Sequence, residues 1–151
     1  MAITANWYTN AMIGQFGATA ARRVDWVTDT INVALCTVAY VPDQDANVFF
    51  SDVTNELPTA GGYTAGGLAL AGKSVVVDNP TNETRLKGGS SIWGPPATFT
   101  CRIAVIYKST GAAGTSPLLG WVNFGGDETV SSGTFTIAWD ATNGLLKVAA
   151  A

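Results

Sequence analysis

Residues Thr98–Asp140 read TFTCRIAVIYKSTGAAGTSPLLGWVNFGGDETVSSGTFTIAWD. Apolar and polar residues alternate over 99–107 and again over 135–139, which is typical of strands that place one face on a core. Gly125-Gly126-Asp127 interrupts the pattern in the way that a turn does. We therefore expect three β-strands in this segment, joined by turns rich in Gly, Ser and Thr.

Outside this segment the chain shows further strand patterns and one helical pattern. Apolar residues near helical spacing occur over 6–21. One helix with seven or eight short strands is typical of an antiparallel β-sandwich with Greek-key or jelly-roll connections. We expect a mainly β fold, with residues 1–151 as a single domain. The further strand patterns cover residues 31–41, 68–77, 84–87, 91–93 and 144–148.

The composition indicates a folded chain with little charge. Charged residues make up 13% of the sequence and hydrophobic residues 47%, and the mean hydropathy is +0.22. Disordered chains show the opposite balance. Because obligate interfaces are more apolar than free surface, this composition suits a protein that neighbouring subunits partly cover. Ala and Gly also raise the apolar count without making a sticky surface, which is the alternative explanation.

Charge and cysteine content exclude several partners and compartments. The net charge is −3, and the eight basic residues are scattered apart from Arg22-Arg23, so we expect no nucleic-acid partner. No stretch has the length of a membrane span, and the first residues lack a signal peptide, so we expect no membrane partner and synthesis in a cytoplasm. Cys36 and Cys101 lie in apolar strand patterns, where we expect two buried thiols. A disulfide would form only if their strands were neighbours.

The sequence offers little for catalysis. It contains no histidine, which excludes a Ser-His-Asp or Cys-His site and a standard zinc site built with its two cysteines. Asp43, Asp45, Asp52 and Glu56 lie close together in sequence, but glycoside hydrolysis needs carboxylates at a defined separation. We expect no enzyme, no catalytic residue and no cofactor.

The same acidic segment resembles the start of a calcium-binding loop. Asp43, Asp45 and Asn47 space three oxygen ligands as an EF-hand does. Val48 stands where that loop needs Gly, and Thr54 stands where it needs a bidentate Glu. We therefore expect the Asp and Asn side chains to cap the local backbone rather than to bind a metal.

Several aromatic residues are candidates for an exposed surface. Trp7 and Tyr8 lie near the N-terminus, and Trp93 precedes Gly94-Pro95-Pro96. Exposed Trp and Tyr stack on sugars and also anchor protein interfaces. The aromatic residues of this chain are interleaved with aliphatic ones, which favours a core or a subunit interface over a sugar-binding module.

The order and spacing of short motifs along most of the chain resemble small virion proteins of tailed bacteriophages. The motifs of the second half are R-x-A-V-I-Y-K at 102–108, S-P-L-L-G at 116–120, V-x-F-G-G-D at 122–127 and G-T-F-T-I-x-W-D at 133–140. The first half carries D-W-V-T-D-T-I-N-V-A-L at 25–35, a P-D-x-D loop followed by an aromatic pair and S-D-V within 42–53, and G-Y-T-A-G-G-x-x-L at 62–70.

The resemblance implies a virion structural protein. We expect a capsid decoration, or cement, protein on the capsid surface, which binds the major capsid protein as a homotrimer and bridges capsomers. The alternatives are a tail- or fibre-associated component that contacts a host glycan, and a carbohydrate-binding β-sandwich module. The residues that we expect at the partner interface are Trp7, Tyr8, Met12, Phe49, Phe50 and Trp93.

Overall fold

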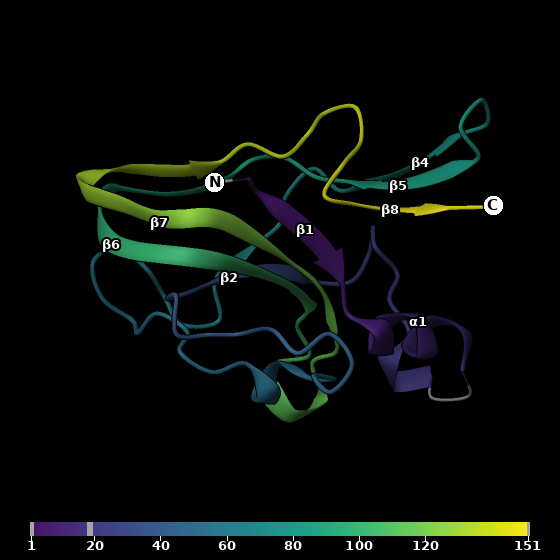
Figure 1. The fold of residues 1–151 in the computed structure, drawn as a ribbon, viewed down its shortest axis with the longest axis horizontal. Coiled ribbons are helices and arrows are strands. Elements are labelled where there is room, and N and C mark those ends of the chain that lie inside the picture. The colour runs from purple at the N-terminus through teal and green to yellow at the C-terminus, as the bar shows by residue number, and fades with distance from the viewer. Residues whose placement is uncertain (1, 18–19, 151) are drawn as a thin grey trace.

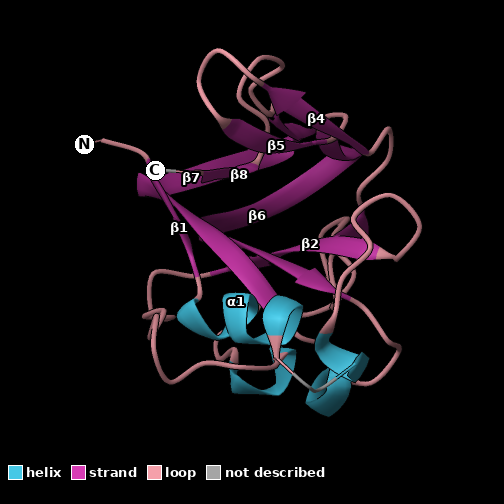
Figure 2. Ribbon diagram, turned by 90° about the vertical axis from the view of Figure 1, so that its right-hand side faces the viewer, coloured by secondary structure: helices cyan, strands magenta, loops and turns pink. Residues whose placement is uncertain are grey.

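The computed structural model describes residues 2–17 and 20–150 and has two antiparallel β-sheets with one α-helix (Figures 1 and 2). This arrangement confirms the predicted mainly β fold and is sandwich-like. The larger sheet has the order β1-β7-β6-β2-β3, and the smaller one has the order β4-β5-β8. The strands of the larger sheet are β1 (Thr4–Trp7), β2 (Ile31–Cys36), β3 (Leu68–Ala69), β6 (Ser91–Lys108) and β7 (Leu118–Ile137).

The larger sheet is covered on both faces at β2 and β6. Ile31, Val33 and Leu35 join one apolar cluster, which also receives residues of the smaller sheet. Ala34 and Cys36 alternate with them and join a second cluster on the opposite face. The alternation read from the sequence therefore marks real strands, although both of their faces are buried.

The smaller sheet projects from this core at the upper right of Figure 1. It consists of β4 (Ser74–Asp78), β5 (Glu83–Lys87) and β8 (Leu146–Ala149). The last strand confirms the strand expected near 144–148. The strand expected over 68–77 is wrong as one element, because Gly72 takes a left-handed φ of +60° and separates β3 from β4.

The strongest strand segment of the sequence forms two strands instead of three. β6 and β7 pair as one long hairpin, and Gly125-Gly126-Asp127 lies inside β7. Cys101 pairs with Glu128 and Ile103 with Asn123, so β7 carries extra residues that bulge out of the ladder. Gly125 has a φ of +82°, and this conformation lets the chain bulge without ending the strand.

The separate strand expected over 91–93 is also wrong, because it is the first part of β6. A register shift between Trp93 and Ala97 takes up Gly94-Pro95-Pro96 within the strand. The paired ends of β6 and β7 fold back over the rest of the hairpin, as the left side of Figure 1 shows. Phe124 and Phe135 of β7 consequently meet with ring centroids 6.2 Å apart.

The N-terminal segment differs most from the prediction. The helix expected over 6–21 is α1 (Thr9–Phe16), and it is preceded by β1 and followed by a 3₁₀ turn, Ala20–Arg22; residues 18 and 19 of the expected helix lie outside the described residues. Tyr8 follows β1: its amide still donates to Leu119 O of β7 at 3.0 Å, and its side chain is buried in the core. Gly14 lets the chain approach closely, since a Cβ there would lie 3.0 Å from Arg22 O.

Candidate interaction surface

Two of the predicted interface residues are core residues, which corrects the prediction. Tyr8 is 0% exposed, and its hydroxyl shares a 2.6 Å hydrogen bond with the Tyr40 hydroxyl. Burial raises the pKa of Tyr8 far above its ordinary value. Trp93 is 2% exposed and packs against Phe135, with ring centroids 5.8 Å apart. Neither side chain offers a surface to a partner or to a sugar.

The predicted pair Phe49 and Phe50 is half-buried. The ring of Phe50 stacks on Tyr107 of β6 at 4.0 Å, with an angle of 7° between the rings. The Arg22 guanidinium lies over the Phe49 ring, 5.5 Å from its centroid. Residues Phe50–Asp52 form a 3₁₀ turn. These contacts bury most of the surface of the two rings inside the molecule.

Trp7 and Met12 are the predicted residues that lie at an open groove. Both line a groove between β8 and the start of α1, together with Val148 and Ala149. The Trp7 indole donates a 2.9 Å hydrogen bond to the carbonyl of Lys147 in β8. This bond holds the indole against the smaller sheet.

The apolar surface continues from the groove along α1. Phe16 lies one helical turn beyond Met12, and residues four apart are neighbours on a helix surface. Phe16 is 84% exposed, the largest fraction among the big apolar side chains of the described residues. The helix thus presents an aromatic ring to solvent beside the groove.

The smaller sheet adds valines that the sequence prediction missed. Val77 pairs with Thr84, and Thr84 pairs with Val148, so these three side chains lie on one face of the sheet. Val75 pairs with Leu86, and Leu86 pairs with Leu146, and these side chains lie on the same face. Leu86 and Leu146 pack on the core, whereas the valines lie beyond its edge. We call Val75, Val77 and Val148 the overhang face; they are 45%, 64% and 42% exposed.

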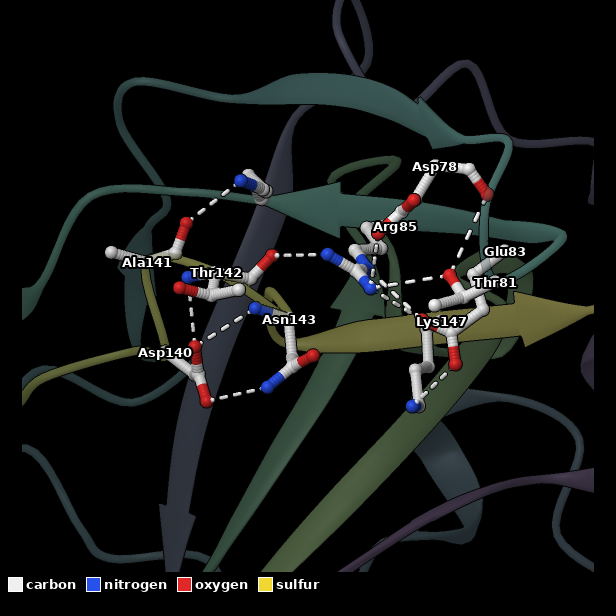
Figure 3. A network of polar contacts seen from close by, with 10 residues as sticks. Asp78, Thr81, Glu83, Arg85, Asp140, Ala141, Thr142, Asn143 and Lys147 are labelled. Carbon is white, nitrogen blue, oxygen red and sulfur yellow. Dashed lines mark hydrogen bonds and ion pairs between the residues drawn. The ribbon is translucent and has the colours of Figure 1, made fainter.

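The opposite face of the smaller sheet is a polar network (Figure 3). Arg85 forms ion pairs with Asp78 at 2.6 Å and with Glu83 at 2.8 Å, and Lys147 pairs with Glu83 at 2.6 Å. Hydrogen bonds from Lys147 and Arg85 lower the pKa of Glu83 to about 2. Arg85 also donates to Thr142 O, which ties the sheet to the loop before β8.

The acidic segment caps its own backbone, as expected. Asp43 Oδ1 accepts the amides of Asp45 and Ala46, and Asn47 Oδ1 accepts the amide of Asp43. Among residues 2–17 and 20–150, no group of three or more His, Cys, Asp or Glu residues is arranged to hold a metal ion.

Cys36 and Cys101 are free and buried. Burial raises the pKa of each thiol to about 12, so both stay protonated at neutral pH. The structure therefore gives them a packing role.

The chain matches no known protein family, no curated protein and no solved structure. None of the helices in the described part of the chain is long and apolar enough to cross a membrane. The groove, α1 and the overhang face together form the candidate interaction surface.

Proposed function

We propose that the chain is a structural protein of a tailed-bacteriophage virion and that it decorates the capsid by binding the major capsid protein. One observation supports the protein-binding role: exposed apolar side chains lie together on α1 and on the adjoining smaller sheet. Contiguous exposed apolar surface is rare on soluble monomers and marks interaction sites. The resemblance of the motifs to phage virion proteins supports the class of partner.

The surface is suited to a partner that reaches both elements. Trp7 and Met12 form the groove, Phe16 extends it along α1, and the overhang face extends it along the smaller sheet. The ion pairs of Arg85 stiffen that sheet from its other side. A stiff surface loses little conformational entropy when it binds. Contacts of this kind with several coat subunits add affinity without any one strong contact, and an assembly of several copies would multiply them.

A sugar-binding module is less well supported than capsid binding. Its candidate aromatic residues include Trp93, and this side chain packs inside the core. A tail or fibre location uses the same apolar surface, so the two virion locations have to be separated by experiment.

The test is to mix the purified protein with capsids that lack it and to image them by electron cryomicroscopy. We expect ordered density at symmetric positions between capsomers and capsids that withstand higher temperatures. Val77→Asp and Phe16→Asp should each reduce the occupancy at least about tenfold, because a buried unpaired charge is costly. Val41→Asp is the matched control, since Val41 is 79% exposed and does not line the groove.

Two outcomes would contradict the proposal. Bare capsids in the presence of folded wild-type protein would exclude the decoration role and direct the search to tails and fibres. Equal loss of occupancy with Val41→Asp and Val77→Asp would show that the named surface is not the one that binds.

A further inference from the structure

The smaller sheet has one open edge, formed by β4. This strand pairs with β5 and has no partner strand on its other side among the described residues, and Figure 2 shows it at the outside of the molecule. In an antiparallel ladder, alternate residues direct their N–H and C=O groups to opposite sides. Within the described ranges, no hydrogen bond except those to β5 reaches the backbone of residues 74–77.

The edge lacks the devices that protect exposed strands. Proteins blunt free edges with Lys, Pro, bulges or short strands. β4 pairs with β5 over five residues without a register shift, and Val75, Val76 and Val77 follow one another, all exposed. The one charged residue of the strand, Asp78, is neutralised by Arg85 within the same sheet. An extended, uncharged strand with free backbone groups is a template for another strand.

The other edge of the smaller sheet is partly covered by a side chain. β8 forms that edge, and its Lys147 carbonyl accepts the Trp7 indole N–H at 2.9 Å. A side chain of the same molecule therefore covers part of the β8 edge, whereas β4 stays open.

We propose that β4 pairs antiparallel with β4 of a second copy of this chain, about a two-fold axis at Val76. Such an axis is perpendicular to the sheet and leaves every side chain on its own side of the sheet. Only residues on the same side can therefore lie opposite each other, and the register can shift only by two residues at a time. With the axis at Val76, Val75 faces Val77 of the second copy and Val76 faces its own equivalent. Ser74 then faces Asp78.

Neighbouring registers fit less well. An axis at Val75 sets Lys73 against Val77, and an axis at Val77 sets Asp78 against Val76. The sequence around Val76 is therefore self-complementary in one symmetric register only. Self-complementarity of this kind is what a two-fold interface requires, because each residue meets the equivalent of its own partner.

The pairing produces one sheet in the order β8-β5-β4-β4-β5-β8. The valines of the two overhang faces meet at its centre, because Val75 and Val77 of each copy lie on the same face. The two outer edges are then the β8 edges, which the Trp7 indoles cover. This inference goes beyond capsid decoration and does not depend on it.

The first test is the mass of the purified protein in solution, measured by light scattering or sedimentation over a range of concentrations. We expect a dimer with twice the 15.6 kDa of the chain. Val76→Lys and Val76→Glu each place like charges opposite each other at the axis, and each should weaken the dimer about tenfold or more. Mixing the two variants should restore a mixed dimer, since opposite charges then meet.

The second test fixes the register with a cysteine. Residues that face each other in an antiparallel pair have Cα atoms about 4.5–5.5 Å apart, within the range for a disulfide. Val76→Cys should cross-link to itself under mild oxidation, whereas Val77→Cys should cross-link only when mixed with Val75→Cys. Val38→Cys is the exposed control away from β4, and the natural cysteines are buried.

A monomer at all concentrations would overturn the proposal, and so would a trimer whose Val76→Cys variant stays unlinked. Cross-linking of Val38→Cys as fast as of Val76→Cys would show random collision and would also overturn it. Thermal unfolding of each variant establishes that a loss of the dimer is not a loss of the fold.

Discussion

Glu83 lies at the centre of the polar face of the smaller sheet. Its carboxylate accepts hydrogen bonds from Arg85 of its own strand and from Lys147 of β8. The side chain is 12% exposed, so these contacts are only partly screened by solvent. One carboxylate thus links the middle strand of the sheet to the strand at the C-terminus.

The pKa of Glu83 makes the stability of the protein depend on pH. The pKa falls from an ordinary 4.5 to about 2 in the folded chain. A lowered pKa stabilises the folded state fully above the unfolded value, and this contribution is lost as pH falls through the folded value. We expect the urea midpoint to decrease between about pH 5 and pH 2.

The control for this prediction is Glu83→Gln, which keeps the shape of the side chain and removes its titration. The variant should be less stable than the wild type at neutral pH and should lose less stability on acidification. An identical pH profile for the two proteins would show that the ion pairs of Glu83 do not contribute.

Tyr8 and Trp93 show at the scale of single residues why sequence reasoning misplaced part of the interface. Tyr8 lies near the N-terminus and Trp93 lies beside a turn signal, and both contexts suit an exposed anchor as well as a core residue. Burial of Tyr8 depends on Tyr40, which is 32 residues away and supplies the hydroxyl partner. A distant partner of this kind leaves no local trace in the sequence.

At the scale of elements, the folded-back hairpin of β6 and β7 depends on an aromatic cluster. Phe135 lies at its centre, with ring centroids 5.4 Å from Phe99, 5.8 Å from Trp93 and 6.2 Å from Phe124. The cluster joins the two ends of β7 across the bend. Phe135 is only half-buried, so its contribution is smaller than that of a full core residue.

Phe135→Ala should therefore lower the free energy of unfolding by about 2–3 kcal/mol, because it removes the ring that the other three contact. The measurement is urea unfolding followed by tryptophan fluorescence. Ile92→Ala is the control on the same end of the hairpin, where the side chain is exposed, and it should change the stability by no more than about 0.5 kcal/mol. Equal effects of both substitutions would argue against the cluster.

The existence of most strands, though not of β1, could be predicted from the sequence, but strand ends could not. Alternation predicted β2 because the period of two is local. Gly125-Gly126-Asp127 and Gly94-Pro95-Pro96 read as turns, yet the ladder resumes after each of them. The same residue types permit a turn and a bulge. The choice between the two depends on the paired strand, which the local sequence does not contain.

At the scale of the whole molecule, the candidate surface could be predicted only in part. Trp7 and Met12 could be predicted because the N-terminal segment carries apolar groups for which a lone sandwich has no obvious need. Val77 and Val148 were missed because their common face exists only once β4 and β8 both flank β5. Apolar strand residues are ordinarily core residues, so nothing in the sequence marks these valines as exposed.

The composition of this surface predicts how the proposed capsid binding responds to salt. The side chains that carry the proposal, Trp7, Met12, Phe16 and the overhang face, are uncharged, whereas the charges of Arg85 and Glu83 lie on the opposite face of the sheet. Salt screens charge interactions, with a Debye length that falls from about 10 Å at 0.1 M to about 3 Å at 1 M, but it does not weaken apolar contacts. We therefore expect the occupancy on capsids to stay constant or to rise slightly between these concentrations.

The measurement is sedimentation of capsids with bound protein at each salt concentration. The double-charge variant Arg85→Gln with Glu83→Gln serves as the control for the polar face and should bind with the same salt dependence, provided that it is folded. A steep loss of binding with salt in the wild type would mean that charged groups make the contact, and the capsid-binding surface would then have to be sought on the face that carries Arg85 and Lys147. Constant binding by the wild type and loss of binding by Val77→Asp at every salt concentration would assign the contact to the overhang face.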